Sequence, residues 1–155
     1  AIMDALHAQA ETAFQAPPPK KPGLDELIAY LEAQYIPMVV ASSSRMASIL
    51  RHLNNWNMTN HFKALISGEQ FTSSKPDPEI FLTAAKALGT TPAETLVLED
   101  SYNGVRAGAR GGFVTVMVPD LAPADDEMRS LYTAECKDLR EVKKMLEEGK
   151  LLSEA

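Results

Sequence analysis

Two adjacent carboxylates, Glu99 and Asp100, are the residues of this sequence most suited to binding a metal ion. They follow a short apolar run at 95–98 that is typical of a buried parallel strand, and Ser101 can cap a helix after them. Ligands of open α/β sheets bind outside the carboxyl ends of the strands, so both acids stand where chemistry is usually done. Adjacent carboxylates repel each other, and a shared hard cation such as Mg²⁺ would make the pair favourable. The alternative is that the two acids only complement the positive end of the following helix.

A second polar group follows another apolar run, at 36–41, and consists of Ser42, Ser43, Ser44 and Arg45. Serine hydroxyls and free backbone N–H groups at a helix N-terminus make a ready site for an anion such as phosphate. Arg45 could reach a bound phosphate from the same loop. A serine N-cap beside a solvated arginine is the alternative interpretation of these residues.

Lys75 is the third candidate, because Pro76, Asp77 and Pro78 after it predict a rigid entry to a helix. In that helix Asp77 is expected as the N-cap and Pro78 at the first helical position. An ammonium group beside a phosphate neutralises developing negative charge, whereas the alternative is a lysine in solvent. Hydroxyls, an ammonium group and metal-binding acids are what phosphoryl transfer requires around a nucleophile. Together the three groups outweigh their separate alternatives.

Strands alternate with helices along the sequence, which predicts βαβ units on a parallel sheet. The fold class is therefore α/β, a Rossmann-like parallel sheet with flanking helices. A proline-rich linker at 16–23 is the clearest internal boundary, and 119–127 is expected as an acidic loop. Apolar spacing predicts helices at 1–15, 24–34, 46–53, 78–88, 101–110 and 139–146, and strands at 36–41, 63–67, 95–98 and 113–118.

The composition of these 155 residues is that of a single soluble domain with one sizeable core. The net charge of −6 argues against nucleic acid or an anionic membrane as a partner, because both require clustered Lys and Arg. No apolar run is long enough to span a membrane. The only cysteine, Cys136, excludes an internal disulfide and suits a reducing compartment, so we expect a cytoplasmic protein.

Three segments, at 39–44, 75–81 and 97–108, resemble motifs II, III and IV of the haloacid dehalogenase superfamily. They are closest to its phosphatase and phosphoglucomutase-like branch. The resemblance runs from about Pro22 to the C-terminus. It implies a remnant of a helical cap with a linker at 1–21 and an incomplete α/β core of this superfamily at 22–155.

The resemblance implies a role for each matched residue. Ser42 would donate a hydrogen bond to the phosphoryl oxygens, and Lys75 would neutralise them and the nucleophile. Asp100 would ligate Mg²⁺, and Glu99 would ligate it directly or through water. The implied activity is Mg²⁺-dependent hydrolysis of a small phosphorylated metabolite, with a sugar phosphate favoured, through an aspartyl-phosphate. A sugar-phosphate mutase and a non-catalytic binding module of the same fold are the alternatives.

The first motif of the superfamily, Asp-x-Asp-Gly-Thr at the end of a strand, has no counterpart here. Asp4 lies in a helical pattern, with no strand before it and no second aspartate two residues on. The superfamily places the missing strand at the centre of the sheet, between the strands that end at Ala41 and Leu98. We therefore expect an N-terminal segment from undetermined residues or a separate chain, or else re-pairing of the two flanking strands. Without the aspartate the chain alone is expected to be inactive.

Overall fold

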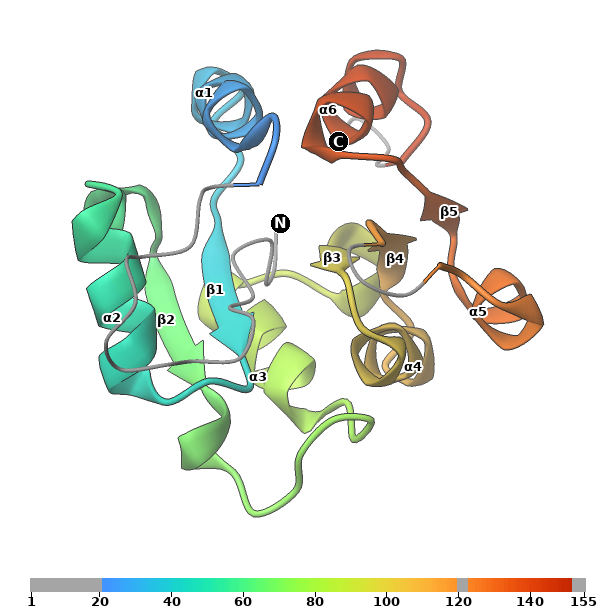
Figure 1. Cartoon of the computed structure of the whole chain (residues 1–155), viewed down its shortest axis with the longest axis horizontal. Coiled ribbons are helices and arrows are strands. Elements are labelled where there is room, and N and C mark those ends of the chain that lie inside the picture. The colour runs from blue at the N-terminus through green and yellow to red at the C-terminus, as the bar shows by residue number, and fades with distance from the viewer. Residues whose placement is uncertain (1–20, 120–122, 152–155) are drawn as a thin grey trace.

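The computed structural model describes residues 21–119 and 123–151, and Figure 1 shows strands and helices that alternate along this part of the chain. The helices are α1 (Leu24–Ala33), α2 (Met46–Asn55), α3 (Glu79–Leu88), α4 (Tyr102–Arg110), α5 (Asp126–Leu131) and α6 (Leu139–Glu147). The strands are β1 (Val39–Ser42), β2 (Ala64–Ser67), β3 (Leu96–Glu99), β4 (Val114–Met117) and β5 (Ala134–Glu135). Short 3₁₀ turns are η1 (Thr59–His61), η2 (Gly68–Gln70) and η3 (Pro92–Glu94). The expected α/β class is confirmed, and the expected helix at 1–15 lies outside the described residues.

The strands form two parallel sheet pieces. β1 pairs with β2, with Val39 opposite Ala64, and β3 pairs with β4, with Leu96 opposite Val114; β5 continues this second piece beyond β4. Among the residues that the structure describes, no ladder joins β1 to β3, and Figure 1 shows these two strands facing each other across the middle of the molecule. The flanking strands have therefore not re-paired with each other. A further strand between them stays a prediction.

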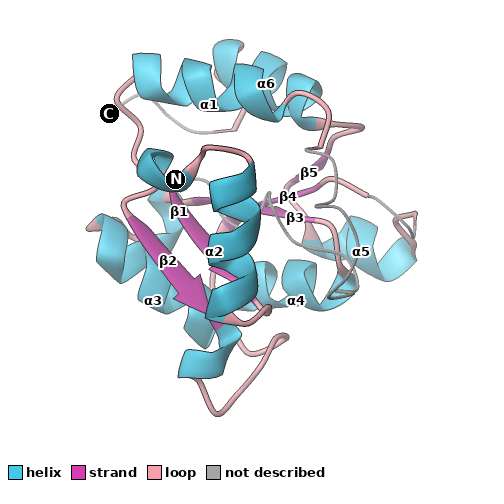
Figure 2. Cartoon of the chain, turned by 60° about the vertical axis from the view of Figure 1, so that its left-hand side comes forward, coloured by secondary structure: helices cyan, strands magenta, loops and turns pink. Residues whose placement is uncertain are grey.

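Both sheet pieces contribute to two apolar clusters, one on each face, because successive side chains of a strand point to opposite faces. On the first face Val40 of β1 and Leu98 of β3 belong to one apolar cluster with residues of α1, α2 and α6. On the second face Val39 and Val97 belong to another cluster, with residues of α3 and α4. Figure 2 shows α1 and α6 above the strands and α3 and α4 below them. The result is a three-layer arrangement that fixes the carboxyl ends of the strands.

The second face depends on small residues in α4 and on a pair of aromatic rings. A Cβ atom on Gly108 would lie 2.5 Å from Oγ1 of Thr115, so glycine lets α4 pack directly on β4. The rings of Phe81 and Phe113 meet edge to face, with centroids 6.0 Å apart. Phe81 is fully buried. Large buried rings of this kind contribute about 3–5 kcal/mol each to stability when truncation to alanine is the reference.

Local capping signals in the sequence are confirmed at several helix ends. Ser101 caps α4, with its side chain accepting a hydrogen bond from the Gly104 N–H. Gly89 ends α3 in the left-handed conformation, at φ 73°, which favours glycine. Thr91 and Glu94 form the expected capping box around η3.

Two expectations need correction. α3 begins at Glu79, so Pro78 takes the N-cap position instead of the first helical position. Asp77 still supplies the acceptor, because its Oδ1 lies 2.9 Å from the Glu79 nitrogen. The region expected as an acidic loop ends in a helix, α5, which Asp125 caps by accepting a hydrogen bond from the Met128 N–H. A six-residue helix after a proline-marked acidic run has too little apolar periodicity to be detected.

The described part of the chain contains no helix that combines the length and the apolar character needed to cross a membrane.

Cys136 is fully buried in the cluster of the first face, with its Sγ 3.3 Å from the Met145 Sδ. Burial raises the pKa of this thiol to about 11, and the carboxylates of Glu141, Asp138 and Glu135 act in the same direction. We expect the folded chain to resist a disulfide reagent at pH 8 and the urea-unfolded chain to react completely. A folded chain that reacts within seconds would contradict this expectation.

The same pKa shift predicts how stability depends on pH. The fold favours the protonated thiol, so its contribution is complete below the ordinary value of 9.0 and is lost as the pH rises through about 11. Urea unfolding of the chain and of its Cys136→Ala variant at pH 8 and pH 10.5 isolates this contribution.

Candidate functional site

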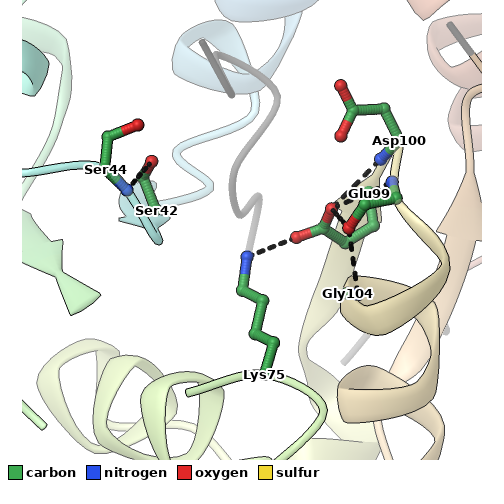
Figure 3. A network of polar contacts seen from close by, with 7 residues as sticks. Ser42, Ser44, Lys75, Glu99, Asp100 and Gly104 are labelled. Atoms are coloured by element: carbon green, nitrogen blue, oxygen red, sulfur yellow. Dashed lines mark hydrogen bonds and ion pairs between the residues drawn. The ribbon is translucent and has the colours of Figure 1, made fainter. Parts of the chain in front are cut away.

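Glu99 and Lys75 form a buried ion pair at the carboxyl end of β3. The Glu99 Oε2 lies 2.5 Å from the Lys75 Nζ, and the two side chains are 0% and 5% exposed (Figure 3). The ammonium group also lies over the ring of Phe81, with Nζ 4.8 Å from the ring centroid. A buried lysine that contacts a carboxylate and an aromatic ring is not in solvent, so the alternative interpretation of Lys75 is wrong.

The second oxygen of Glu99 is bound by the N-terminus of α4. Its Oε1 accepts hydrogen bonds from the backbone N–H groups of Asp100 and Ser101, at 3.1 and 3.3 Å, and from the Ser101 hydroxyl at 3.2 Å. A helix N-terminus favours negative charge, so these donors stabilise the ionised carboxylate. The expected dipole interaction of Glu99 is therefore present, and the ion pair with Lys75 is present beside it.

Gly104 makes room for this carboxylate in the first turn of α4. A Cβ atom at position 104 would lie 2.0 Å from the Glu99 Cδ and 2.3 Å from its Cγ. Any side chain other than hydrogen would therefore displace Glu99 from the N-terminus of the helix. Steric room for the Glu99 carboxylate therefore explains why position 104 is a glycine.

Asp100 has a different ammonium group as its neighbour. The Lys21 Nζ lies 3.5 Å from the Asp100 Oδ2, and the Asp100 side chain is 9% exposed. Figure 3 shows the Asp100 carboxylate directed away from Lys75. The two acids thus remain adjacent in space, with one lysine near each of them, and their charges are locally balanced.

The donor chemistry of these acids fits part of a magnesium site. Mg²⁺ is a hard cation, and proteins usually hold it through one or two carboxylates while water and substrate phosphate complete its coordination. Glu99 and Asp100 supply two such carboxylates. Within 21–119 and 123–151 no group of three or more His, Cys, Asp or Glu side chains gathers in a way that could hold a metal ion. Further oxygen ligands would have to complete the site.

The serine loop, Ser42 to Arg45, begins at the last residue of β1 in the other sheet piece. Ser42 is buried, and its Oγ accepts a hydrogen bond from the Ser44 N–H at 3.1 Å. α2 begins at Met46 with Arg45 in the N-cap position and no side-chain cap from it, so the alternative of a serine N-cap is not what the structure shows. Ser43 and Arg45 are exposed. Figure 3 shows Ser42 and Ser44 opposite the Lys75–Glu99 pair.

Two residues near the site were not expected from sequence spacing. Lys21 reaches Asp100 from the linker before α1, and Glu69 reaches the start of α2 from the turn after β2. No pattern of neighbouring residues in the sequence predicts either contact, because each depends on where the strands lie relative to one another. The juxtaposition of Lys75 with Glu99, in contrast, agrees with their expected positions at one edge of the sheet.

The parallel α/β core thus carries a buried lysine–glutamate pair and a serine loop at the carboxyl ends of its strands, the edge where open α/β sheets bind their ligands. Residues 3–118 match the family described as haloacid dehalogenase-like hydrolase. The chain belongs to this family.

Several curated relatives are similar to this chain. The bifunctional riboflavin kinase/FMN phosphatase of Arabidopsis thaliana is 37% identical over 116 residues, which cover 73% of this chain and 29% of that protein. Hexitol phosphatase B of Escherichia coli is 30% identical over 148 residues, covering 89% of this chain and 66% of that protein. Beta-phosphoglucomutase of Bacillus subtilis is 38% identical over 98 residues, covering 63% and 42% respectively.

Solved structures support the same fold. A beta-phosphoglucomutase from Clostridium difficile superimposes with a TM-score of 0.73 at 23% identity, covering 85% of this chain and 56% of that one. This similarity shows the fold alone. The chain spans 29% to 66% of the length of the three curated relatives.

Proposed function

We propose that this chain supplies the phosphate-binding and metal-binding residues of a phosphatase that acts on a small phosphate ester, with sugar phosphates as the preferred class. The observation that carries the proposal is the buried Lys75–Glu99 pair, 2.5 Å apart, beside a second carboxylate. Withdrawing two charged groups from water is costly unless their attraction and further hydrogen bonds offset the cost, so such a pair at the ligand-binding edge of the sheet favours a functional role. Relatives named as phosphatases support the class of reaction.

In the proposed mechanism Lys75 neutralises the phosphoryl oxygens, and Glu99 keeps its ammonium group charged and oriented. The Ser42 hydroxyl and the backbone N–H groups of its loop donate hydrogen bonds to the same oxygens. Asp100 and Glu99 would hold Mg²⁺, which supplies charge stabilisation to the phosphoryl group when it is bound. These residues of the chain therefore bind and orient the phosphate, and none of them acts as the nucleophile.

We assign the nucleophilic aspartate to a further parallel strand between β1 and β3, from residues outside the described ranges or from a separate chain. Within the described residues the facing edges of β1 and β3 are not joined to each other. Backbone N–H and C=O groups of a buried strand edge require partners, and an inserted strand would satisfy both edges. Its carboxyl end would place an aspartate between the serine loop and Lys75. Without this aspartate the chain alone could form no aspartyl-phosphate and would be inactive.

The test compares the chain alone with a protein that also carries the residues encoded directly before Ala1. Both are assayed for phosphate release from a panel of sugar phosphates, with and without MgCl₂. We expect release only from the extended protein and only with MgCl₂. The Lys75→Met variant should lower this activity by about 10²–10³-fold, the usual effect of removing one charge-stabilising donor.

The exposed Lys86→Met variant in α3 is the matched control and should retain activity. Phosphate release by the chain alone would contradict the assignment of the nucleophile. An upstream segment without Asp-x-Asp-Gly-Thr, together with an inactive extended protein, would favour the non-catalytic binding module.

A sugar-phosphate mutase is the second candidate, since one relative is named beta-phosphoglucomutase and is 38% identical over the matched residues. Both reactions need the same phosphate-binding residues, and they differ in whether water or a sugar hydroxyl accepts the phosphoryl group. Phosphorus NMR of the reaction separates them, because a phosphatase accumulates inorganic phosphate whereas a mutase accumulates an isomeric sugar phosphate.

A further inference from the structure

The N-terminus of α2 receives its hydrogen-bond acceptor from another part of the chain. The first N–H groups of a helix have no partner within the helix, and Arg45 gives α2 no side-chain cap. The Met46 nitrogen lies 2.6 Å from the Glu69 Oε1. Glu69 belongs to η2, the turn that follows β2. A carboxylate from the turn after β2 therefore caps α2, the helix that follows the serine loop.

The turn that carries Glu69 is fastened to the serine loop by additional contacts. The Ser67 hydroxyl donates to the Ser44 carbonyl oxygen at 2.6 Å and accepts from the Glu69 N–H at 3.2 Å. Ser67 is fully buried. A Cβ atom at Gly68 would lie 3.1 Å from the Ser43 carbonyl oxygen, so the two backbones are in close contact. The position of the Glu69 side chain and the conformation of the serine loop are therefore linked.

We infer that Glu69 is a positioning residue of the phosphate site: its hydrogen bond to Met46 fixes the start of α2 and with it the serine loop. This inference rests on the proposed function, in which that loop binds phosphate. The carboxylate also takes the Met46 N–H, which confines a bound anion to Ser42 and the backbone N–H groups before Met46. Glu69 acts through the loop and does not touch the substrate.

The conservative variant separates the hydrogen bond from the charge. Glu69→Gln retains an oxygen that can accept from the Met46 N–H, whereas Glu69→Ala retains none. Glu69 is exposed, so neither change is expected to prevent folding. Glu147→Ala, at an exposed acid that ends α6, is the matched control for loss of one negative charge.

The experiment is an NMR titration of the full 155-residue chain with inorganic phosphate, followed at the backbone amides of the serine loop. We expect Glu69→Ala to weaken phosphate binding about three- to tenfold, the effect of one ordinary hydrogen bond. Glu69→Gln and Glu147→Ala should stay within about twofold of the unchanged chain. Hydrogen exchange of the Met46 amide, measured without phosphate, should accelerate in Glu69→Ala and remain slow in Glu69→Gln.

Unchanged phosphate binding in Glu69→Ala would overturn the inference and leave the proposed function intact. Equal weakening in Glu69→Gln and Glu69→Ala would also overturn it, because the charge and not the hydrogen bond would then matter. If the unchanged chain bound no phosphate while the Met46 amide behaved as expected, the anion site of the proposed function would fail, and the inference would fail with it.

Discussion

The free energy of unfolding of the Lys75→Met variant should be about 3–5 kcal/mol lower than that of the unchanged chain. This is the usual cost of removing one partner of a buried ion pair. The substitution removes the ammonium group, which lies 2.5 Å from the Glu99 Oε2 and over the Phe81 ring, and replaces it with an apolar side chain of similar length. The carboxylate then remains in the interior without the cation that offsets its loss of hydration. Urea unfolding followed by far-UV circular dichroism measures the difference.

A second variant tests whether charge, and not packing, causes this loss. In Lys75→Met/Glu99→Gln the glutamine is neutral and its oxygen can still accept from the N–H groups of Asp100 and Ser101. We expect the double variant to recover most of the stability lost in Lys75→Met. Lys86→Met, at an exposed lysine of α3, should change stability by less than about 0.5 kcal/mol. A double variant as unstable as Lys75→Met would show that the pair is not the cause.

Gly104→Ala should destabilise the chain by up to about 3 kcal/mol, the typical cost of forcing an additional methyl group into a packed site. In an ordinary helix the same change is stabilising by about 1 kcal/mol, because alanine has the higher helix propensity. The opposite sign is expected here because the new Cβ would lie 2.0 Å from the Glu99 Cδ. Thermal unfolding of the variant measures the sign directly.

The Glu99→Ala background provides the decisive comparison for position 104. Removing the carboxylate removes the atoms that the new methyl group would meet, so Gly104→Ala should become neutral or stabilising in that background. Arg110→Ala, at an exposed residue near the end of the same helix, controls for helix propensity without a steric conflict. If Gly104→Ala destabilised the unchanged chain and the Glu99→Ala variant equally, the new methyl group would clash with an atom other than those of the Glu99 carboxylate.

What the sequence allowed one to predict is mainly local. The Ser101 cap and the Gly89 helix end each depend on a few consecutive residues, and both are present. The order of strands and helices follows from apolar periodicity, which is also a short-range signal. β5 contains two residues, too few for any alternation to be recognised.

The contacts that the sequence did not reveal join segments that are distant along the chain. The hydrogen bond between Met46 and Glu69 depends on the register of β1 against β2, and an exposed glutamate in a turn has no pattern that predicts its partner. Lys21 meets Asp100 for a similar reason, through the path of the linker before α1. Lys75 and Glu99 were expected at one edge of the sheet, but their direct pairing required the side-chain geometry that α3 and α4 impose.

The ring of Phe81 belongs at once to the packing of the second face and to the surroundings of Lys75. It meets Phe113 edge to face, and the Lys75 ammonium group lies over it. A smaller or larger side chain at position 113 would therefore shift the Phe81 ring and change the aromatic surface that the Lys75 ammonium group contacts. Phe113 carries no polar group, yet it helps to set the surroundings of a buried charge.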